Sequence, residues 1–129
     1  MIQFTPTTLL AVALGGAFGA SARFYVTYMV GKHFPHDLPL ATLGVNLVGS
    51  FFIGLLVALF LHYTPNEHIK LFLITGFLGA LTTYSTFAIE TFMLLNNSIV
   101  LGIINIILNL IGTILLAALG YKIMLYFLR

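Results

Sequence analysis

Four long apolar runs separated by short polar loops constrain this chain more than any other feature of its sequence. The runs cover residues 8–30, 40–62, 69–95 and 99–127. A helix of about 20 predominantly apolar residues crosses the roughly 30 Å hydrocarbon core of a bilayer. We therefore predict an all-α membrane protein in which residues 1–129 form one domain of four transmembrane helices, embedded in the cell membrane as a multi-pass protein.

The composition supports this class of protein and excludes several others. Apolar residues make up 60% of the chain and charged residues only 6%, whereas a soluble domain carries about 25% charged residues. The net charge of +2 comes from basic residues that are scattered along the chain, so no patch suited to nucleic acid forms. The chain has no cysteine, which excludes disulfides and thiolate sites, and no nucleophile–base pair or phosphate loop indicates an enzyme.

The basic residues near the ends of the runs give only a weak bias in topology. With a cytoplasmic N-terminus, Lys70, Lys122 and Arg129 lie on the cytoplasmic side and Lys32 lies on the other side. The orientation of a membrane protein follows the Lys and Arg residues close to its span ends. A bias this small allows a fixed orientation, and it also allows a chain that inserts both ways round.

The third run differs from a plain transmembrane helix between residues 75 and 90. Besides Tyr84, it contains Gly76, Gly79 and Glu90, together with five hydroxyl residues: Thr75, Thr82, Thr83, Ser85 and Thr86. Glycine and threonine both weaken a helix, and polar residues inside a membrane face protein or a water-filled cavity. We predict a helix broken near Gly79–Thr82, with a cation bound to the freed carbonyls. A continuous helix whose threonines bond to their own preceding turn is the alternative.

Tyr84, Phe87 and Glu90 fall on one face of the third run. The edge of an aromatic ring is electropositive, so ring edges turned into a pore would coordinate an anion without trapping it. Ordinary core packing of the two aromatic residues is the alternative. Glu90 does not suit an anion path, and we expect its carboxylate to pair with a basic or hydroxyl group.

Polar side chains also recur at helical spacing in two other runs. Asn105, Asn109 and Thr113 share one face of the fourth run, and Asn46 and Ser50 share one face of the second. An unpaired amide in hydrocarbon is costly, so each stripe needs a partner. The stripes either hydrogen-bond other helices or line a wet path, and their coincidence on three runs favours a path.

Arg23 is the only permanent positive charge well inside a run. At the floor of a water-filled vestibule it would attract anions and repel cations. The alternative is a lipid-interface anchor whose long side chain reaches the membrane surface.

Three segments carry longer motifs, which together extend over nearly the whole chain. Residues 15–23 read GGAFGASAR, residues 39–50 read PLATLGVNLVGS, and residues 76–87 read GFLGALTTYSTF. Together they resemble the Fluc family of fluoride channels, the CrcB-type proteins. The third motif is long and chemically unusual for a membrane helix, which makes chance agreement very improbable.

The resemblance implies an antiparallel homodimer, formed by subunits that insert in both orientations, with two fluoride pores and a structural sodium ion at its centre. By position, Gly79 and Thr82 would give backbone carbonyls to sodium, and Arg23 would help to form the vestibule. The pore residues would be Asn46, Tyr84, Ser85, Thr86, Phe87, Asn105, Asn109 and Thr113. Their weak donors in series would replace the water around fluoride. The implied function is passive export of fluoride from the cytoplasm, which lowers its toxicity, with no organic cofactor.

Three features depart from the family pattern. Tyr84 stands where phenylalanine is usual, Ala80 replaces the second glycine of a pair, and Asn105 and Asn109 stand in place of a tyrosine and a serine. An asparagine amide still donates to fluoride, so the polar track can persist with altered chemistry. The altered first aromatic residue leaves open that the chain is the non-conducting half of a heterodimeric channel.

Two other functions stay open on the sequence. A small proton-coupled exporter of cationic compounds can have this size, but it needs a membrane-embedded carboxylate early in the chain. The first run instead carries Arg23 and no acid. A non-transporting assembly subunit would use its polar stripes only to join helices.

Overall fold

The computed structural model describes residues 3–129, in which four helical segments are long and apolar enough to cross a membrane. These segments are Pro6–His33, Leu40–His62, Glu67–Asn97 and Ile99–Phe127. The prediction of an all-α chain with four transmembrane helices is therefore confirmed. Three of the segments are single helices, namely α1 (Pro6–His33), α2 (Leu40–His62) and α6 (Ile99–Phe127).

The third span is divided into several elements. A short α3 (Glu67–Lys70) leads into the π-helical η1 (Leu71–Leu78), which is followed by α4 (Gly79–Leu81) and α5 (Tyr84–Asn97). Between α4 and α5, Thr82 and Thr83 have extended backbone, with ψ angles of 155° and 115°. Thr83 then acts as the N-cap of α5, because its side chain accepts a hydrogen bond from the Thr86 N–H.

Local sequence signals determine where the long helices begin. Thr5 and Thr8 form a capping box at the start of α1, and Pro6 occupies the first turn, where no N–H donor is needed. Ser98 caps α6 by accepting a hydrogen bond from the Leu101 N–H. Because α5 ends only at Asn97, α6 starts at once and runs back beside it.

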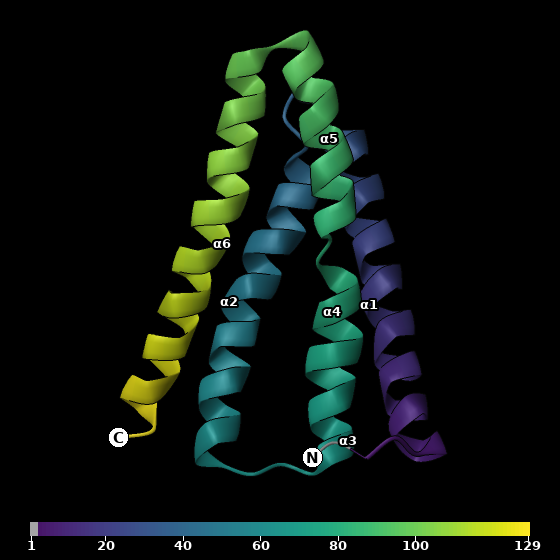
Figure 1. Ribbon diagram of the computed structural model, residues 1–129, viewed down its shortest axis with the longest axis vertical. Helices are drawn as coiled ribbons and strands as arrows, with labels where there is room; N and C mark the ends of the chain where they lie inside the picture. The colour runs from purple at the N-terminus through teal and green to yellow at the C-terminus, as the bar shows by residue number, and fades with distance from the viewer. Residues whose placement is uncertain (1–2) are drawn as a thin grey trace.

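The helices pack as two close pairs, α1 against η1 and α4, and α2 against α6 (Figure 1). The chain enters α1 and leaves α6 at the same end of the bundle, as expected of four spans (Figure 1). A small buried core of Val45, Leu78 and Leu81 joins α2 to the third span. Many other large apolar side chains are exposed in the single chain, as suits helices that cross a bilayer.

Glycines bring the paired helices into backbone contact. A Cβ atom at Gly15 would collide with the Phe72 carbonyl, and one at Gly19 would collide with the Phe77 carbonyl. Gly76 faces the backbone of α1 in the same way. We call these three positions the glycine seam. It holds α1 against the third span by close dispersion contact, since lipid offers no hydrophobic driving force between helices.

The second pair uses the same device. A side chain at Gly54 of α2 would collide with the Ala117 carbonyl of α6, and one at Gly120 of α6 would collide with the Phe51 carbonyl of α2. This contact sets how closely the polar faces of α2 and α6 approach each other. The site described next depends on that approach.

Candidate functional site: a polar cleft beside Thr82 and Thr83

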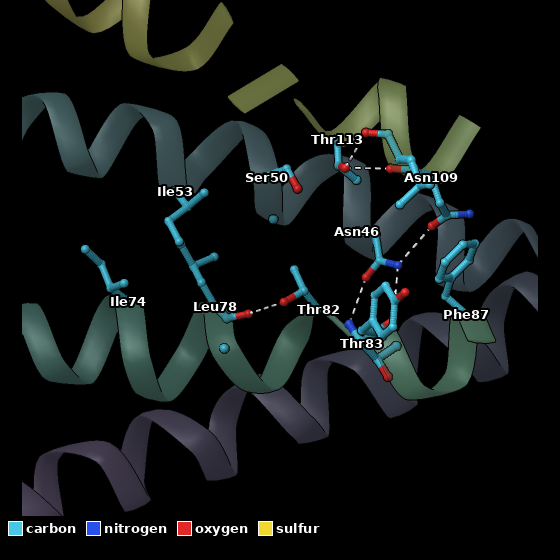
Figure 2. Close-up of a pocket in the computed structure, with 14 residues that line it drawn as sticks. Asn46, Ser50, Ile53, Ile74, Leu78, Thr82, Thr83, Phe87, Asn109 and Thr113 are labelled. Atoms are coloured by element: carbon cyan, nitrogen blue, oxygen red, sulfur yellow. Dashed lines mark hydrogen bonds between the residues drawn. The ribbon is translucent and has the colours of Figure 1, made fainter. Parts of the chain in front are cut away.

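A cleft of about 260 Å³ lies between α2, the third span and α6, next to the non-helical residues (Figure 2). Its lining residues are Asn46, Gly49, Ser50, Ile53, Ile74, Leu78, Gly79, Thr82, Thr83, Tyr84, Phe87, Asn109, Leu110 and Thr113. Gly49 permits the close approach at its centre, because a Cβ atom there would collide with the Thr82 methyl group. The polar faces of three spans therefore meet in one place.

The Asn46 side chain pairs with both backbone groups of Thr83. Its Oδ1 accepts from the Thr83 N–H at 2.8 Å, and its Nδ2 donates to the Thr83 carbonyl at 3.2 Å (Figure 2). Both residues are buried. This two-bond contact stands in for the bonds that a helix would have made, so it stabilises the extended backbone at membrane depth.

The extended backbone at Thr82 and Thr83 leaves two carbonyls without their normal helical donors. The Thr83 N–H, which would bond to Gly79 within a continuous helix, donates to Asn46 instead. The Thr86 N–H, which would bond to Thr82, donates to the Thr83 side chain at 3.3 Å. Gly79 is exposed, Thr82 is half-buried, and both line the cleft, so their carbonyls are the candidates to accept a ligand from outside the chain. Uncharged carbonyl oxygens of this kind suit a hard cation such as sodium.

Asn46 is one member of a longer series of hydrogen bonds that we call the amide chain. Its Nδ2 donates to Asn109 Oδ1 at 3.0 Å, the Asn109 Nδ2 donates to Asn105 Oδ1 at 3.1 Å, and the Asn105 Nδ2 donates to Thr91 Oγ1 at 2.9 Å. The Thr91 hydroxyl closes the series by donating to the Phe87 carbonyl at 2.7 Å. The amide chain therefore starts at Thr83, crosses α2 and α6, and returns to α5.

The predicted pore residues of α2 and α6 occupy different places relative to the cleft. Asn46, Asn109 and Thr113 line it, whereas Asn105 is 0% exposed and is absent from its lining. The Thr113 hydroxyl bonds to its own helix, donating to the Asn109 carbonyl at 2.5 Å. The stripe at residues 105, 109 and 113 thus meets the cleft only at two of its three positions.

Among the third-span residues predicted to form the pore, the two aromatic rings line the cleft. Tyr84 and Phe87 lie with ring centroids 5.5 Å apart at an interplanar angle of 62°. Tyr84 is 75% exposed, while Phe87 is only 6% exposed. Ser85 and Thr86 do not line the cleft, and Thr86 accepts a hydrogen bond from the Thr83 hydroxyl at 2.9 Å. The Tyr84 ring thus projects from the chain at the cleft margin.

Arg23 and Glu90, the charged residues that lie farthest from the ends of the spans, are not part of the cleft lining. Arg23 is half-buried on α1, where its carbonyl accepts a hydrogen bond from the Thr27 hydroxyl. Thr42 of α2 donates to Glu90 Oε1 at 2.9 Å, which is the hydroxyl partner expected for this carboxylate. Within residues 3–129 the other carboxylate oxygen, Oε2, is buried and has no hydrogen-bond partner.

Thr83 and Thr91 hold central places in this site, but the sequence did not identify their roles. Thr83 is one of several hydroxyl residues in a row, and nothing in that row distinguishes it as the partner of Asn46. Thr91 does carry a signal, since it lies one helical turn after Phe87 on α5. An extension of the polar face by one turn would have included it.

Comparison with known protein families assigns the chain to one of them. A family model described as "CrcB-like protein, Camphor Resistance (CrcB)" matches residues 10–121. The chain belongs to the CrcB family. The resemblance found in the sequence motifs is thereby confirmed, and the four spans make this family member a multi-pass membrane protein.

Curated relatives of the CrcB chain carry a common name. A protein from Sulfurimonas denitrificans, named fluoride-specific ion channel FluC, is 53% identical over 118 residues, covering 90% of this chain and 92% of the relative. A protein of the same name from Nautilia profundicola is 43% identical over 117 residues, covering 89% and 91%. Another from Campylobacter fetus is 42% identical over 114 residues, covering 88% and 87%.

Proposed function

We propose that this chain is the subunit of a fluoride-selective channel that lets fluoride leave the cytoplasm passively. The observation that carries the proposal is the polar cleft, in which faces of α2, the third span and α6 meet beside an extended backbone segment. The relatives named as fluoride-specific channels match the chain along almost its full length, which supports the same function here. Polar residues inside a membrane often mark the path of an ion, so their gathering at membrane depth also supports the proposal.

The chemistry of the cleft suits a small anion that holds its water tightly. Amide and hydroxyl donors and the edges of Tyr84 and Phe87 would replace hydration water in several weak steps, which permits both entry and exit. Both Asn46 Nδ2 donations end on protein oxygens, those of Thr83 and Asn109. A fluoride ion at this point would displace one of these neutral acceptors, and its full charge would make a stronger bond to the amide.

The exposed margin of the cleft supports a dimer. Tyr84 and Gly79 line the cleft, yet both are exposed in the single chain, so a second subunit would supply the missing wall. A twofold partner in the opposite orientation would place the same residues opposite one another. The weak distribution of Lys and Arg permits insertion both ways round, as such a dimer requires. A closely related but different subunit would satisfy the same geometry.

We also assign a functional break to the third span and a structural sodium ion to its carbonyls. Gly79 and Thr82 of each subunit would hold the ion, since their carbonyls lack the normal helical donors. Sodium would supply the positive charge that irregular carbonyls need in hydrocarbon and would tie the two broken spans together. Arg23 would lie in the vestibule that admits the anion.

Liposomes loaded with potassium fluoride test the proposed function. Purified chain is reconstituted alone, and a potassium ionophore removes the electrical barrier to fluoride efflux. Rapid fluoride efflux with retention of chloride in parallel vesicles supports a selective channel formed by this chain. No efflux from the chain alone, with efflux restored by a second family subunit, identifies one half of a heterodimer.

The same vesicles separate the rival functions. Uptake of a cationic dye driven by a proton gradient, with no fluoride efflux, would identify an exporter of cationic compounds. Silence in every assay, with or without a second subunit, would leave the polar residues as contacts between helices and would overturn the proposal.

A further inference from the structure

Asn105 belongs to the amide chain but has no access to the cleft. Its side chain is 0% exposed and is absent from the cleft lining, whereas Asn109 and Asn46 line the cleft. Its Nδ2 donates to Thr91, and its Oδ1 accepts from Asn109. In this arrangement Asn105 acts on the cleft only through the asparagine next to it.

We propose that Asn105 and Thr91 are positioning residues, which set the orientation of the Asn109 and Asn46 amides and so hold Thr83 in its extended conformation. This inference rests on the proposed channel function and specifies how its site is held. It replaces the expectation that Asn105 contacts fluoride in the pore.

The polarity of the amide chain follows from its Thr91 end. A threonine hydroxyl carries one hydrogen, and Thr91 gives that hydrogen to the Phe87 carbonyl. The Thr91 oxygen therefore only accepts, so Asn105 must present its NH₂ group there. The Asn105 oxygen is then the group that faces Asn109, which must donate in turn.

The same reasoning continues to the other end. Since Asn109 donates to Asn105, its oxygen faces Asn46 and accepts from the Asn46 NH₂ group. That leaves the Asn46 oxygen to accept from the Thr83 N–H, a group that can only donate. Both ends of the amide chain thus demand the same direction, and every amide has one satisfied orientation.

Loss of the Thr91 acceptor would leave the direction of the amide chain set from the Thr83 end alone. An asparagine amide that turns by 180° exchanges its oxygen and nitrogen at little steric cost. In a low-dielectric interior the bonds of a network support one another, so a free end weakens the whole series. Asn105 and Asn109 could then turn for part of the time, so that Asn109 presents oxygen where an anion needs N–H groups, and the bonds between Asn46 and Thr83 would weaken.

The first experiment measures fluoride efflux from liposomes for Thr91→Val, Asn105→Leu and the double variant. Each single variant is expected to lower the efflux rate by about tenfold, equivalent to about 1.4 kcal/mol. The double variant is expected to be no slower than Asn105→Leu, because both changes break one series of bonds. Thr91→Ser keeps the hydroxyl and is expected to restore the wild-type rate.

Thr27→Val is the matched control. Thr27 of α1 is exposed and donates to the Arg23 carbonyl at 2.9 Å, the same bond to its own helix that Thr91 makes on α5. Its replacement removes a hydroxyl of the same kind without touching the amide chain. An efflux rate unchanged by Thr27→Val shows that the loss of a threonine hydroxyl bonded to its own helix does not by itself lower efflux.

Hydrogen exchange in peptides covering residues 82–87 gives a second readout that does not depend on transport. Thr91→Val is expected to speed exchange at Thr83, and Thr27→Val is not. If Asn105→Leu fails to fold, the exchange rates of Thr91→Val and Thr27→Val still test the positioning role.

Two results would overturn the inference. One is loss of efflux in Asn105→Leu while Thr91→Val keeps both its efflux and its exchange rate, since Asn105 would then act without Thr91. The other is the absence of any effect in both variants. A wild-type chain that carries no fluoride but whose exchange at Thr83 responds to Thr91→Val would instead defeat the proposed function and leave the positioning role intact.

Discussion

The glycine seam and the amide chain solve the problem of joining helices in a membrane in opposite ways. At the seam, Gly15, Gly19 and Gly76 bring backbones into contact, and within residues 3–129 no side-chain hydrogen bond joins α1 to η1 or α4. The amide chain instead joins α5, α2 and α6 through side-chain hydrogen bonds between buried polar residues. One contact is made by shape and the other by directed polar groups.

This difference between the two contacts explains which region can bind an ion. Dispersion contacts between backbones depend on shape alone and have no donor to offer a ligand. A hydrogen-bonded amide can exchange one acceptor for another, and it lies beside the cleft in this chain. The seam therefore supports the scaffold, while the amide chain is the part able to respond to an ion.

The largest expected effect is that of Asn46→Leu, which removes the amide that joins the amide chain to Thr83. It leaves the buried Thr83 N–H and carbonyl without partners, and each unpaired group is expected to lower the free energy of unfolding by roughly 1–3 kcal/mol. Fluoride efflux is expected to fall by at least about 100-fold, which corresponds to about 2.7 kcal/mol. The same substitution at the exposed Asn96 is the control, and efflux near the wild-type rate in Asn46→Leu would contradict the role given to this amide.

Gly19→Ala tests the seam. Its new Cβ atom would collide with the Phe77 backbone carbonyl, which cannot move aside as a side chain can. The free energy of unfolding is expected to fall by about 2–3 kcal/mol, measured by thermal or denaturant unfolding in detergent.

Gly16→Ala is the matched control for this change, because nothing lies within 4 Å of a Cβ atom at Gly16 on the same helix. It is expected to keep or raise stability, by up to about 1 kcal/mol from helix propensity. Equal losses of stability in the two variants would show that the seam is not held by close contact.

Replacement of sodium by a bulky organic cation tests whether the carbonyls of Gly79 and Thr82 bind sodium. Bound sodium at ten times its Kd would stabilise the proposed dimer by about 1.4 kcal/mol, so the temperature at which that dimer dissociates is expected to drop when sodium is replaced. Exchange of the counter-anion alone, at constant sodium, should leave that temperature unchanged. A dissociation temperature that does not depend on sodium would contradict the proposed sodium site.

The smallest effect is expected for Thr42→Val at the end of the polar region. Glu90 Oε1 would lose its hydroxyl donor, while Oε2 already lacks a partner within residues 3–129. The expected loss is about 1 kcal/mol of unfolding free energy, the usual net value of one hydrogen bond. Thr42→Ser keeps the donor and should match the wild type, and equal stability in Thr42→Val would show that the bond contributes nothing.

The limits of sequence-based prediction are clearest in α6. Asn105, Asn109 and Thr113 recur at helical spacing, so their common face could be predicted from the sequence. Which of the three reach the cleft could not be predicted. Asn109 and Thr113 line it, while Asn105 is covered by α5. Periodicity gives the face of a helix, but neighbouring helices decide which part of that face stays open. The sodium ion, the second subunit and the fluoride ligands stay predictions.

The sequence by itself determined the four spans, because crossing a bilayer depends on the local length and hydropathy of each segment. It also marked the third span as unsuited to one plain helix, through its glycines and threonines. Only the tertiary structure decided that Asn46 would meet Thr83 and Asn109, which lie 37 and 63 residues away. The physical reason is that a hydrogen bond needs atoms placed within a few tenths of an ångström, and that placement follows from how the glycine contacts set the approach of whole helices.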